Sequence, residues 1–356
     1  MCRDNVVFVS ATSLFSGGGL TILNQFLESI DENHQYLIFI DDNAHFETNK
    51  SNITFVNVKR GVWSRLKWDY FSYWFYAKKN NIKPKAIVSL QNTCVFFPGA
   101  KQIVYLHQGI PFSNTEWSFI KRSERKYAFY KHVYPFFIFS LYRRDIHYVV
   151  QTTWMKASMM ERFSIDGEKI SVIKPSFVSS STETGYFPNI EHEIALFYPA
   201  SEELFKNHRF IFECIRKIGS KNRHKVGFYL TLEPDCELSK KAVEMGIESN
   251  VVFMGNLKFS EVQASYKCMS ALVFPTSIES YGLPLLEAST KGVPIICNNT
   301  KFCQELIGSY DGATIIELEH EPWCKAILSL SKKQVFPEYT PTFQSSWLDF
   351  FDIITK

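Results

Sequence analysis

Two glutamates with seven residues between them, Glu279 and Glu287, are the side chains of this chain best suited to chemistry on a ligand. They stand in the segment SIESYGLPLLEASTKGVPIIC, residues 277–297. Gly282 lets the backbone approach a ligand closely, and the free N–H groups of a helix that follows it attract an anion. The pattern indicates a ligand that combines an anion with hydroxyl-rich groups, as a sugar nucleotide does.

A strand, a turn and a short helix must position these glutamates. Apolar residues predict strands over 271–275 and 293–297, with a turn over 280–284 and a helix over 285–291 that ends at a glycine. We expect the first glutamate in the loop ahead of this helix and the second inside it. Glutamates at this spacing also occur on solvated helix faces, so a surface helix with incidental acids is the alternative.

The segment resembles the signature of family 4 of the retaining glycosyltransferases, which have the GT-B fold. The resemblance implies that Glu287 takes the ribose hydroxyls of the donor and that Glu279 lies by the transferred sugar. It also implies that the backbone amides of Tyr281, Gly282 and Leu283 hold the diphosphate or the sugar.

The length of 356 residues exceeds one ordinary core and predicts two domains. Short apolar runs alternate with helical stretches, which indicates parallel sheets with helices on both faces. We therefore expect an α/β protein of the GT-B class, with two Rossmann-like domains whose parallel sheets face a central cleft. Ligands gather at the carboxyl ends of such strands, so the cleft is the expected site.

The predicted domains are residues 1–180 on the acceptor side and residues 194–340 for the nucleotide sugar, joined by a linker over 179–193. A helix in residues 341–356 either crosses back to the first domain through Trp347, Phe350 and Phe351 or caps its own domain. Strands are expected over 5–10, 36–40, 53–58, 86–90, 102–106, 147–151, 170–173, 194–198, 225–231, 250–254, 271–274, 294–297 and 313–316.

Gly17, Gly18 and Gly19 follow the first strand and precede a helix predicted over 20–30. They lack the spacing of a dinucleotide fingerprint, but glycines at a helix start allow close approach to a phosphate or a sugar. The alternative is that they serve a tight turn alone. His107 directly follows a strand, and the resemblance implies that it touches the transferred sugar or the acceptor. A loop histidine with its own partners is the alternative.

Lys206 follows the strand over 194–198, and the resemblance implies that it neutralises the departing diphosphate. The arginine usual five positions earlier is Ser201 here, so Lys206 acts alone or another cation, such as Arg209, substitutes. The resemblance also places backbone groups near Met254 against the nucleotide base. Because backbone recognition leaves no side-chain pattern, the sequence does not name the base.

The expected catalytic residues are therefore His107, Lys206 and Glu279. The pair Asp41-Asp42 ends a strand, but no D-x-D motif and no carboxylate cluster that would hold a divalent ion is present in the sequence. We expect transfer without a metal or cofactor, from a UDP- or GDP-sugar as donor substrate.

Charge and cysteine content bound the setting of the protein. The net charge of +3 divides into +8 for residues 1–180 and −5 for the remainder, so the first half is the part expected to meet an anionic surface. The eight cysteines are scattered without a C-x-x-C pair, which favours free thiols in a reducing cytosol. The first ten residues do not have the pattern of a secretory signal, and no window is apolar enough to span a bilayer.

Two stretches of the first half, residues 59–79 and 121–144, interleave cations with aromatic residues. Such sequences suit the headgroup layer of an anionic membrane, and core helices with basic outer faces are the alternative. Clustered, apolar aromatics fit nucleic acid poorly. The hypothesis is a cytoplasmic enzyme that docks on the inner face of the membrane to extend a lipid-linked oligosaccharide of lipopolysaccharide or O-antigen type. A GT-B epimerase or phosphorylase, or a non-catalytic sugar-nucleotide binding module, is the alternative.

Overall fold

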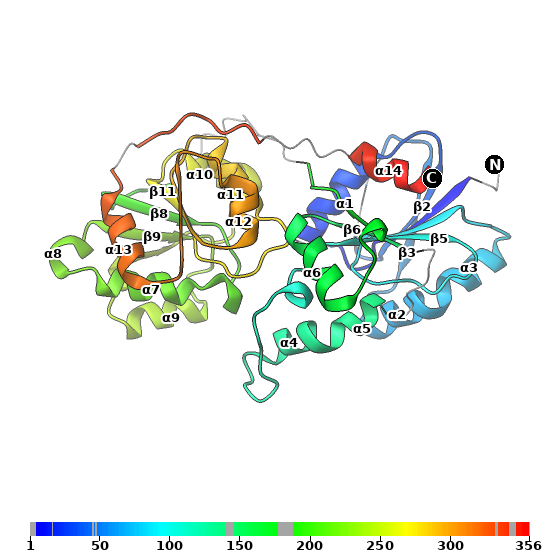
Figure 1. The fold of residues 1–356 in the computed structure, drawn as a ribbon, viewed down its shortest axis with the longest axis horizontal. Coiled ribbons are helices and arrows are strands. Elements are labelled where there is room, and N and C mark those ends of the chain that lie inside the picture. The colour runs from blue at the N-terminus through cyan, green and yellow to red at the C-terminus, as the bar shows by residue number, and fades with distance from the viewer. Residues whose placement is uncertain are drawn as a thin grey trace. The chain divides into compact units, whose positions relative to one another are not determined.

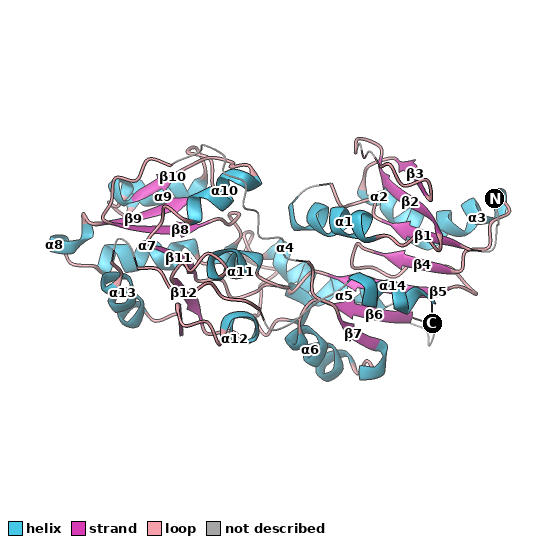
Figure 2. Cartoon of the chain, turned by 90° about the horizontal axis from the view of Figure 1, so that it is seen from above, coloured by secondary structure: helices cyan, strands magenta, loops and turns pink. Residues whose placement is uncertain are grey.

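The computed structural model describes residues 5–15, 17–44, 46, 48–139, 146–176, 188–331, 334–341 and 347–355. The chain divides into two compact units, Met1–Ser176 with Ser345–Lys356, and Phe177–Gln344. Each unit has its own parallel sheet with helices on both faces (Figure 1, Figure 2). The predicted α/β class with two Rossmann-like sheets is therefore confirmed.

The first sheet has seven parallel strands in the order β3-β2-β1-β4-β5-β6-β7. Val9 of the central strand pairs with Ile38 on one side and with Val88 on the other. All seven lie where apolar runs predict them. They are β1 (Val6–Ser10), β2 (Gln35–Asp41), β3 (Ile53–Val58), β4 (Ala86–Ser89), β5 (Lys101–Leu106), β6 (Ile146–Val150) and β7 (Ile170–Val172).

Helices cover both faces of this sheet because successive strand side chains point to opposite sides. Helices α1 (Gly17–Ser29) and α14 (Trp347–Thr355) lie on one face (Figure 1), where the aromatic side chains of α14 surround Phe26. Trp347, Phe350 and Phe351 are all buried there, so the C-terminal helix packs on the first unit. Helix α6 (Thr153–Phe163) covers the region of β6 and β7.

The two basic, aromatic stretches form irregular helices on the opposite face (Figure 1). In the first, a π turn, η1 (Trp68–Ser72), separates α2 (Val62–Lys67) from α3 (Tyr73–Lys79). In the second, a π turn, η3 (Phe129–Val133), separates α4 (Arg125–Ala128) from α5 (Tyr134–Phe139). Arg143 and Arg144, part of the predicted membrane-contact stretch, lie outside the described residues. Short 3-10 turns are η2 (Ile110–Phe112) and η4 (Gly167–Lys169).

The second sheet has six parallel strands in the order β10-β9-β8-β11-β12-β13. The strands are β8 (Ile194–Tyr198), β9 (Val226–Leu230), β10 (Val251–Phe253), β11 (Ala271–Phe274), β12 (Ile295–Asn298) and β13 (Ala313–Ile316). The helices and turns around them are η5 (Leu204–Lys206), α7 (His208–Lys217), α8 (Ser220–Arg223), α9 (Glu237–Glu244), η6 (Glu248–Asn250), α10 (Phe259–Tyr266), α11 (Leu283–Ser289), α12 (Lys301–Ile307) and α13 (His320–Ser329).

Two predicted helix boundaries are wrong, and both helices start earlier than expected. α11 begins at Leu283 because Pro284 is favourable in a first turn, where its missing N–H would have no intrahelical partner. α1 begins at Gly17, so the glycines form its first turn instead of a loop ahead of it. The part of the predicted linker over residues 179–187 lies outside the described residues.

Candidate active site

The strand order of the second sheet places Lys206 and Glu279 at its topological switch point. β8 and β11 are neighbours, and the chain continues from β8 to β9 on one side and from β11 to β12 on the other. In open parallel sheets this point leaves a crevice at the carboxyl ends of the strands, where ligands bind. Lys206 ends η5, in the connection that follows β8, and Glu279 lies in the connection that follows β11.

The structure brings Lys206 and Glu279 together as an ion pair. The Lys206 ammonium donates a hydrogen bond to Oε1 of Glu279, and the two side chains are only 14% and 17% exposed. Asn207 holds the two connections in register: its Nδ2 donates to the carbonyl of Pro275 (2.8 Å) and to Oγ of Ser277 (2.7 Å). Asn207 has the left-handed backbone that asparagine tolerates better than most residues, with φ of 56°. Its role is not evident from the sequence.

Gly282 gives the connection after β11 its shape. Its φ of 101° is in the region that favours glycine, and it precedes the first residue of α11. A Cβ at this position would lie 3.3 Å from Cδ1 of Leu285 and 3.5 Å from Cδ1 of Leu306, so the turn packs closely on both side chains. Tyr281 is buried beside it, and Leu283 starts the helix.

Glu287 lies in α11, buried against α10. The Tyr266 hydroxyl donates a hydrogen bond of 2.8 Å to its Oε2. Burial raises the pKa of Glu287, while the Tyr266 hydroxyl, Lys291 and Gln263 act to lower it. These contacts place Glu287 in a group with Tyr266, and within the described residues no hydrogen bond or ion pair joins it to the Lys206–Glu279 pair. Nothing in the sequence points to Tyr266.

The remaining donor-side predictions concern the backbone after β10 and a second cation. The amide of Met254 donates to the carbonyl of Leu230 (2.8 Å), which fixes the end of this strand beside β9. Ser201 is exposed in the connection after β8. Arg209 is exposed on α7. The pKa of Glu244 on α9 is lowered mainly by Lys241 and to a smaller extent by the charge of Arg209. Within the described residues, no hydrogen bond or ion pair joins Arg209 to Lys206 or Glu279.

The first sheet has its switch point between β1 and β4, and the predicted glycines lie there. Gly17 starts α1 with a φ of +58°, and Gly18 has open space around it. A Cβ at Gly19 would lie 3.0 Å from the Leu14 side chain and 3.8 Å from Cε1 of His107. Glycine at this position therefore allows the start of α1 to approach the end of β5.

His107 lies directly after β5 in a dense set of hydrogen bonds. Its backbone N–H donates to Oδ1 of Asn92 (2.6 Å), whose Nδ2 lies 2.9 Å from Nε2 of the histidine ring. Nε2 also lies 3.0 Å from the carbonyl oxygen of Leu90, which can only accept a hydrogen bond. Burial lowers the pKa of His107 to about 4, so the ring is neutral near pH 7. The Asn92 amide nitrogen can only donate to Nε2, so the two contacts of Nε2 correspond to different tautomers of the neutral ring.

Gln91 connects the loop after β1 with the helices below it. Its Oε1 accepts from Oγ1 of Thr12 (3.1 Å) and from the hydroxyl (2.9 Å) and backbone amide (3.2 Å) of Ser13. Its Nε2 donates to Oγ of Ser10 (2.7 Å) and Oδ1 of Asp69 (3.1 Å). The sequence analysis missed Gln91, although a glutamine directly after a buried strand is a recognisable signal.

A cavity of about 470 Å³ lies at the carboxyl edge of the first sheet beside α1. It is lined by the rings of Phe15 and Phe46 and by Asp41 and Arg60. Oδ2 of the buried Asp41 accepts no hydrogen bond from the described residues and lies 3.7 Å from Nε of Arg60. Arg60 also stacks on the Phe15 ring, 3.8 Å from its centroid. Aromatic faces beside a carboxylate with a vacant acceptor suit the rings and hydroxyls of a saccharide.

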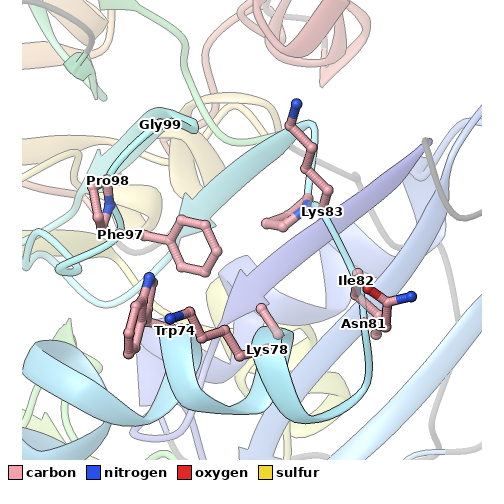
Figure 3. Close-up of a pocket in the computed structure, with 10 residues that line it drawn as sticks. Trp74, Lys78, Asn81, Ile82, Lys83, Phe97, Pro98 and Gly99 are labelled. Atoms are coloured by element: carbon pink, nitrogen blue, oxygen red, sulfur yellow. The ribbon is translucent and has the colours of Figure 1, made fainter.

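Another hollow, of about 530 Å³, opens at the opposite edge of the same sheet. Figure 3 shows Lys78 lying toward the Trp74 ring, with its Nζ 3.8 Å from the ring centroid, while Lys83 points away. Residues 81–84 and 97–99 of its lining precede β4 and β5. It therefore lies at the amino ends of the strands, away from the predicted site residues.

Three further properties bear on the setting. The seven described cysteines are free thiols, as predicted for those positions. Within the described ranges, no group of three or more histidine, cysteine, aspartate or glutamate side chains is arranged to hold a metal ion. None of the described helices combines the length and hydropathy needed to cross a bilayer.

Comparison with known families and proteins relates this geometry to a class of enzymes. The sequence profile of the family described as Glycosyl transferases group 1 matches residues 206–340, a range that includes Lys206, Glu279 and Glu287. Over 277 residues the chain is 23% identical to the O-antigen chain mannosyltransferase RfbU of Salmonella typhimurium, which covers 75% of this chain and 71% of the relative.

Solved structures share the fold over 91% of the chain. WaaG, a glycosyltransferase involved in lipopolysaccharide biosynthesis, matches with a TM-score of 0.65 at 15% identity, over 91% of this chain and 90% of its own. HepE from Anabaena, in complex with UDP-glucose, matches with a TM-score of 0.60 at 12% identity, over 91% and 89% of the two chains. At these identities the two structures establish the shared fold, which is the predicted GT-B class.

Proposed function

Because the chain is a group 1 glycosyltransferase with the GT-B fold, we propose that it moves a hexose from a nucleoside-diphosphate sugar to a growing lipid-linked oligosaccharide. The acceptor belongs to surface polysaccharide synthesis, of the lipopolysaccharide or O-antigen kind, which is the process that the relatives' names describe. Their similarity favours transfer over the alternatives of an epimerase, a phosphorylase or a non-catalytic binding module.

The observation that carries this proposal is the Lys206–Glu279 pair at the switch point of the family-matched unit. Departure of a nucleoside diphosphate leaves negative charge on phosphate oxygens, and a cation in a half-buried setting stabilises it. Lys206 supplies that cation, and Glu279 receives hydroxyls of the transferred sugar. The amides around Gly282 contact the diphosphate or the sugar, and Glu287 holds the ribose.

The donor is a UDP- or GDP-hexose. HepE has been solved in complex with UDP-glucose, and RfbU is a mannosyltransferase by name, so the relatives' names include both glucose and mannose. The base lies by the backbone at Met254, where the amide of this residue is already bonded to Leu230. Recognition by backbone groups leaves the choice of base open to direct measurement.

Transfer proceeds with retention of anomeric configuration and without a metal ion. The acceptor hydroxyl attacks the anomeric carbon on the face that the diphosphate leaves, and the departing phosphate takes the hydroxyl proton. His107, whose neutral ring lies against the start of α1, contacts the sugar or the acceptor. The saccharide of the acceptor occupies the cavity beside Asp41 and Arg60.

The enzyme works in the cytoplasm at the inner face of the membrane. Cations and large apolar side chains are exposed together on the helices of residues 59–79 and 121–139, among them Trp63 (85% exposed) and Phe136 (65%). Such a surface suits anionic headgroups. Sedimentation with anionic liposomes at low salt, lost at high salt, is the expected result, and no sedimentation at either salt concentration would exclude this contact.

A screen of labelled UDP- and GDP-hexoses tests the function directly. The expected result is slow, enzyme-dependent hydrolysis of one donor, which persists in EDTA and stops when Lys206 is replaced by glutamine. Binding of a donor without hydrolysis or transfer would identify a binding module. Loss of activity in EDTA that added divalent cations restore would refute metal independence.

A further inference from the structure

A cavity of about 320 Å³ lies between the two irregular helices of the first unit. Val62, Leu66 and Tyr70 line one side of it, and Phe129, Tyr130 and Phe137 line the other. Its volume is at the lower end of the range for ligand pockets, which begins at about 300 Å³. The sequence analysis treated these helices as a surface for a membrane or as core helices with basic outer faces, and no site residue was predicted here.

Both helices contain a π turn where they border the cavity. Tyr70 belongs to η1, while Phe129 and Tyr130 belong to η3. A π turn inserts an extra residue into the helical repeat and is uncommon, but where it occurs it often marks a functional site. Here two such turns, from segments about sixty residues apart, widen their helices around the same space. This coincidence indicates a cavity shaped for an occupant.

The polar groups at the floor of the cavity are used by one another. Nη2 of Arg65 donates to the carbonyl oxygen of Gln91 (2.8 Å), and Oγ1 of Thr93 donates to Oδ2 of Asp69 (3.1 Å). Asp69 also accepts from Gln91, and burial raises its pKa to about 6 against the opposing effect of Arg65. A sugar would require vacant hydrogen-bonding groups, whereas an apolar chain requires the aromatic and aliphatic walls that remain.

The mouth of the cavity joins apolar side chains with positive charge. Val62 is 75% exposed and Phe129 is 41% exposed, so both extend from the lining to the surface. Residues 59–79 contain six cations and one acid, and the acid is the buried Asp69. An apolar chain that carries an anionic group at one end fits this arrangement, with the chain inside and the anion at the mouth.

The cavity is adjacent to the place where the saccharide of the acceptor is expected. Arg60 lines the cavity beside α1, and Val62, two residues later, lines this one, so their Cα atoms are at most about 7 Å apart. Gln91 further connects the floor at Asp69 to Thr12, in the loop ahead of the glycines. A molecule with a saccharide on one side of an anion and an apolar chain on the other would engage both cavities.

We propose that this cavity binds the apolar chain of the lipid-linked acceptor next to its phosphate. The proposal rests on the proposed function for the existence of such an acceptor, and it adds a site for the part of the substrate that does not react. Lys59 and Arg60, both exposed just ahead of Val62, attract the phosphate. Chain binding holds the acceptor while successive saccharides differ at the reacting end.

Farnesyl monophosphate, used below its micelle concentration, is the probe for this site. Its dissociation constant for the full chain is measured by calorimetry in the absence of donor. Leu66→Trp fills the cavity and is expected to weaken binding at least tenfold, and Val62→Gln at the mouth should weaken it by a smaller factor. Leu328→Trp and Val243→Gln, at exposed helix positions of the second unit, are matched controls that should bind like the parent.

Two competitors separate the sources of the signal. Glycerol phosphate, which has no chain, should not displace the probe, whereas displacement by it would reduce the site to phosphate binding and refute the proposal. Dihexanoyl phosphatidic acid should compete at least tenfold more weakly than farnesyl monophosphate, and equal competition would assign the cavity to bilayer lipid instead of the acceptor. Unchanged binding in Leu66→Trp would also overturn the proposal.

The outcome is independent of the donor chemistry. If the parent protein hydrolyses no sugar nucleotide yet binds farnesyl monophosphate in the cavity, the proposed function fails and the lipid site remains. If it hydrolyses a donor and Leu66→Trp binds the probe like Leu328→Trp, the function remains and the lipid site fails.

Discussion

Replacement of Glu279 by glutamine should tighten binding of the free nucleoside diphosphate while it slows transfer. In the ligand-free protein, the ammonium of Lys206 is already occupied by the Glu279 carboxylate. The diphosphate must therefore compete with this carboxylate for the same cation. Glutamine keeps the size and the hydrogen-bonding oxygen of the side chain but removes its charge, so the cation becomes more available to the product.

The size of the effect follows from the burial of the pair. Both side chains are less than a fifth exposed, so solvent screens the interaction only in part. A hydrogen bond to a charged group in such a setting contributes about 1.5–3 kcal/mol. If about half of that opposes diphosphate binding, UDP or GDP should bind Glu279→Gln about three- to twelvefold more tightly. The rate of sugar transfer should fall because the hydroxyls of the hexose lose the charged carboxylate to which they donate hydrogen bonds.

Isothermal calorimetry with UDP and GDP measures the first effect, and labelled donor hydrolysis measures the second. Lys206→Gln should bind the diphosphate more weakly than the parent, and the double variant should resemble Lys206→Gln because no cation remains to be released. Glu321→Gln, in an exposed pair with Lys325 on α13, is the matched control and should change neither measurement. Weaker binding of the diphosphate by Glu279→Gln would refute competition between carboxylate and phosphate for the lysine.

Three other outcomes are expected. Glu287→Ala should weaken donor binding at least tenfold and lower the free energy of unfolding by about 1–3 kcal/mol, because it leaves the buried Tyr266 hydroxyl without its hydrogen-bond acceptor. Glu287→Gln should retain stability in chemical denaturation. Unchanged donor affinity in both variants would exclude the ribose role. Gly19→Val should reduce turnover and stability because its Cβ would meet a leucine side chain at 3.0 Å, while Gly18→Val, which faces open space, serves as the control; equal effects would show that the close approach is unimportant. Burial lowers the pKa of His208 to about 3, so the folded state binds fewer protons than the unfolded state below pH 6.5. Its contribution to stability is present above that pH and declines, by up to about 1.4 kcal/mol per pH unit, as the pH falls toward 3. Chemical denaturation at several pH values measures how the free energy of unfolding changes with pH. A His208→Gln variant in which this free energy falls as steeply as in the parent would contradict the prediction.

The strands of both sheets could be predicted because they are buried on both faces and therefore appear as continuous apolar runs. Tyr198 at the end of β8 and Phe274 at the end of β11 each close such a run, and the polar residues after them identify the carboxyl edge. The order of the strands follows less directly, since local sequence does not state which strand lies next to β1. The positions of the switch points, and the ion pair between Lys206 and Glu279, could be identified only from the three-dimensional structure.

The missed residues share one property: their partners are distant in sequence. Gln91 contacts Thr12 across 79 positions, and Tyr266 contacts Glu287 across 21. Periodicity reports which face of a helix or strand is buried, but it does not report which polar groups meet inside the fold. The π turns were not predicted from the sequence, because the aromatic residues of 59–79 fit an ordinary amphipathic helix equally well.

The two units use the same device at their switch points, although their residues differ. In each sheet, the two strands at this point are followed by connecting loops, and a side chain of the second loop binds the first. Gln91 binds the loop at Thr12 in the first unit, and Glu279 binds Lys206 in the second. The first tie is neutral and adds further bonds to Ser13, so it holds a loop in place. The second is charged and joins just two side chains, so an anionic ligand can break it. The contrast fits the proposed transfer from a diphosphate to a hydroxyl, in which the first unit would hold a fixed loop and the second would supply an exchangeable cation.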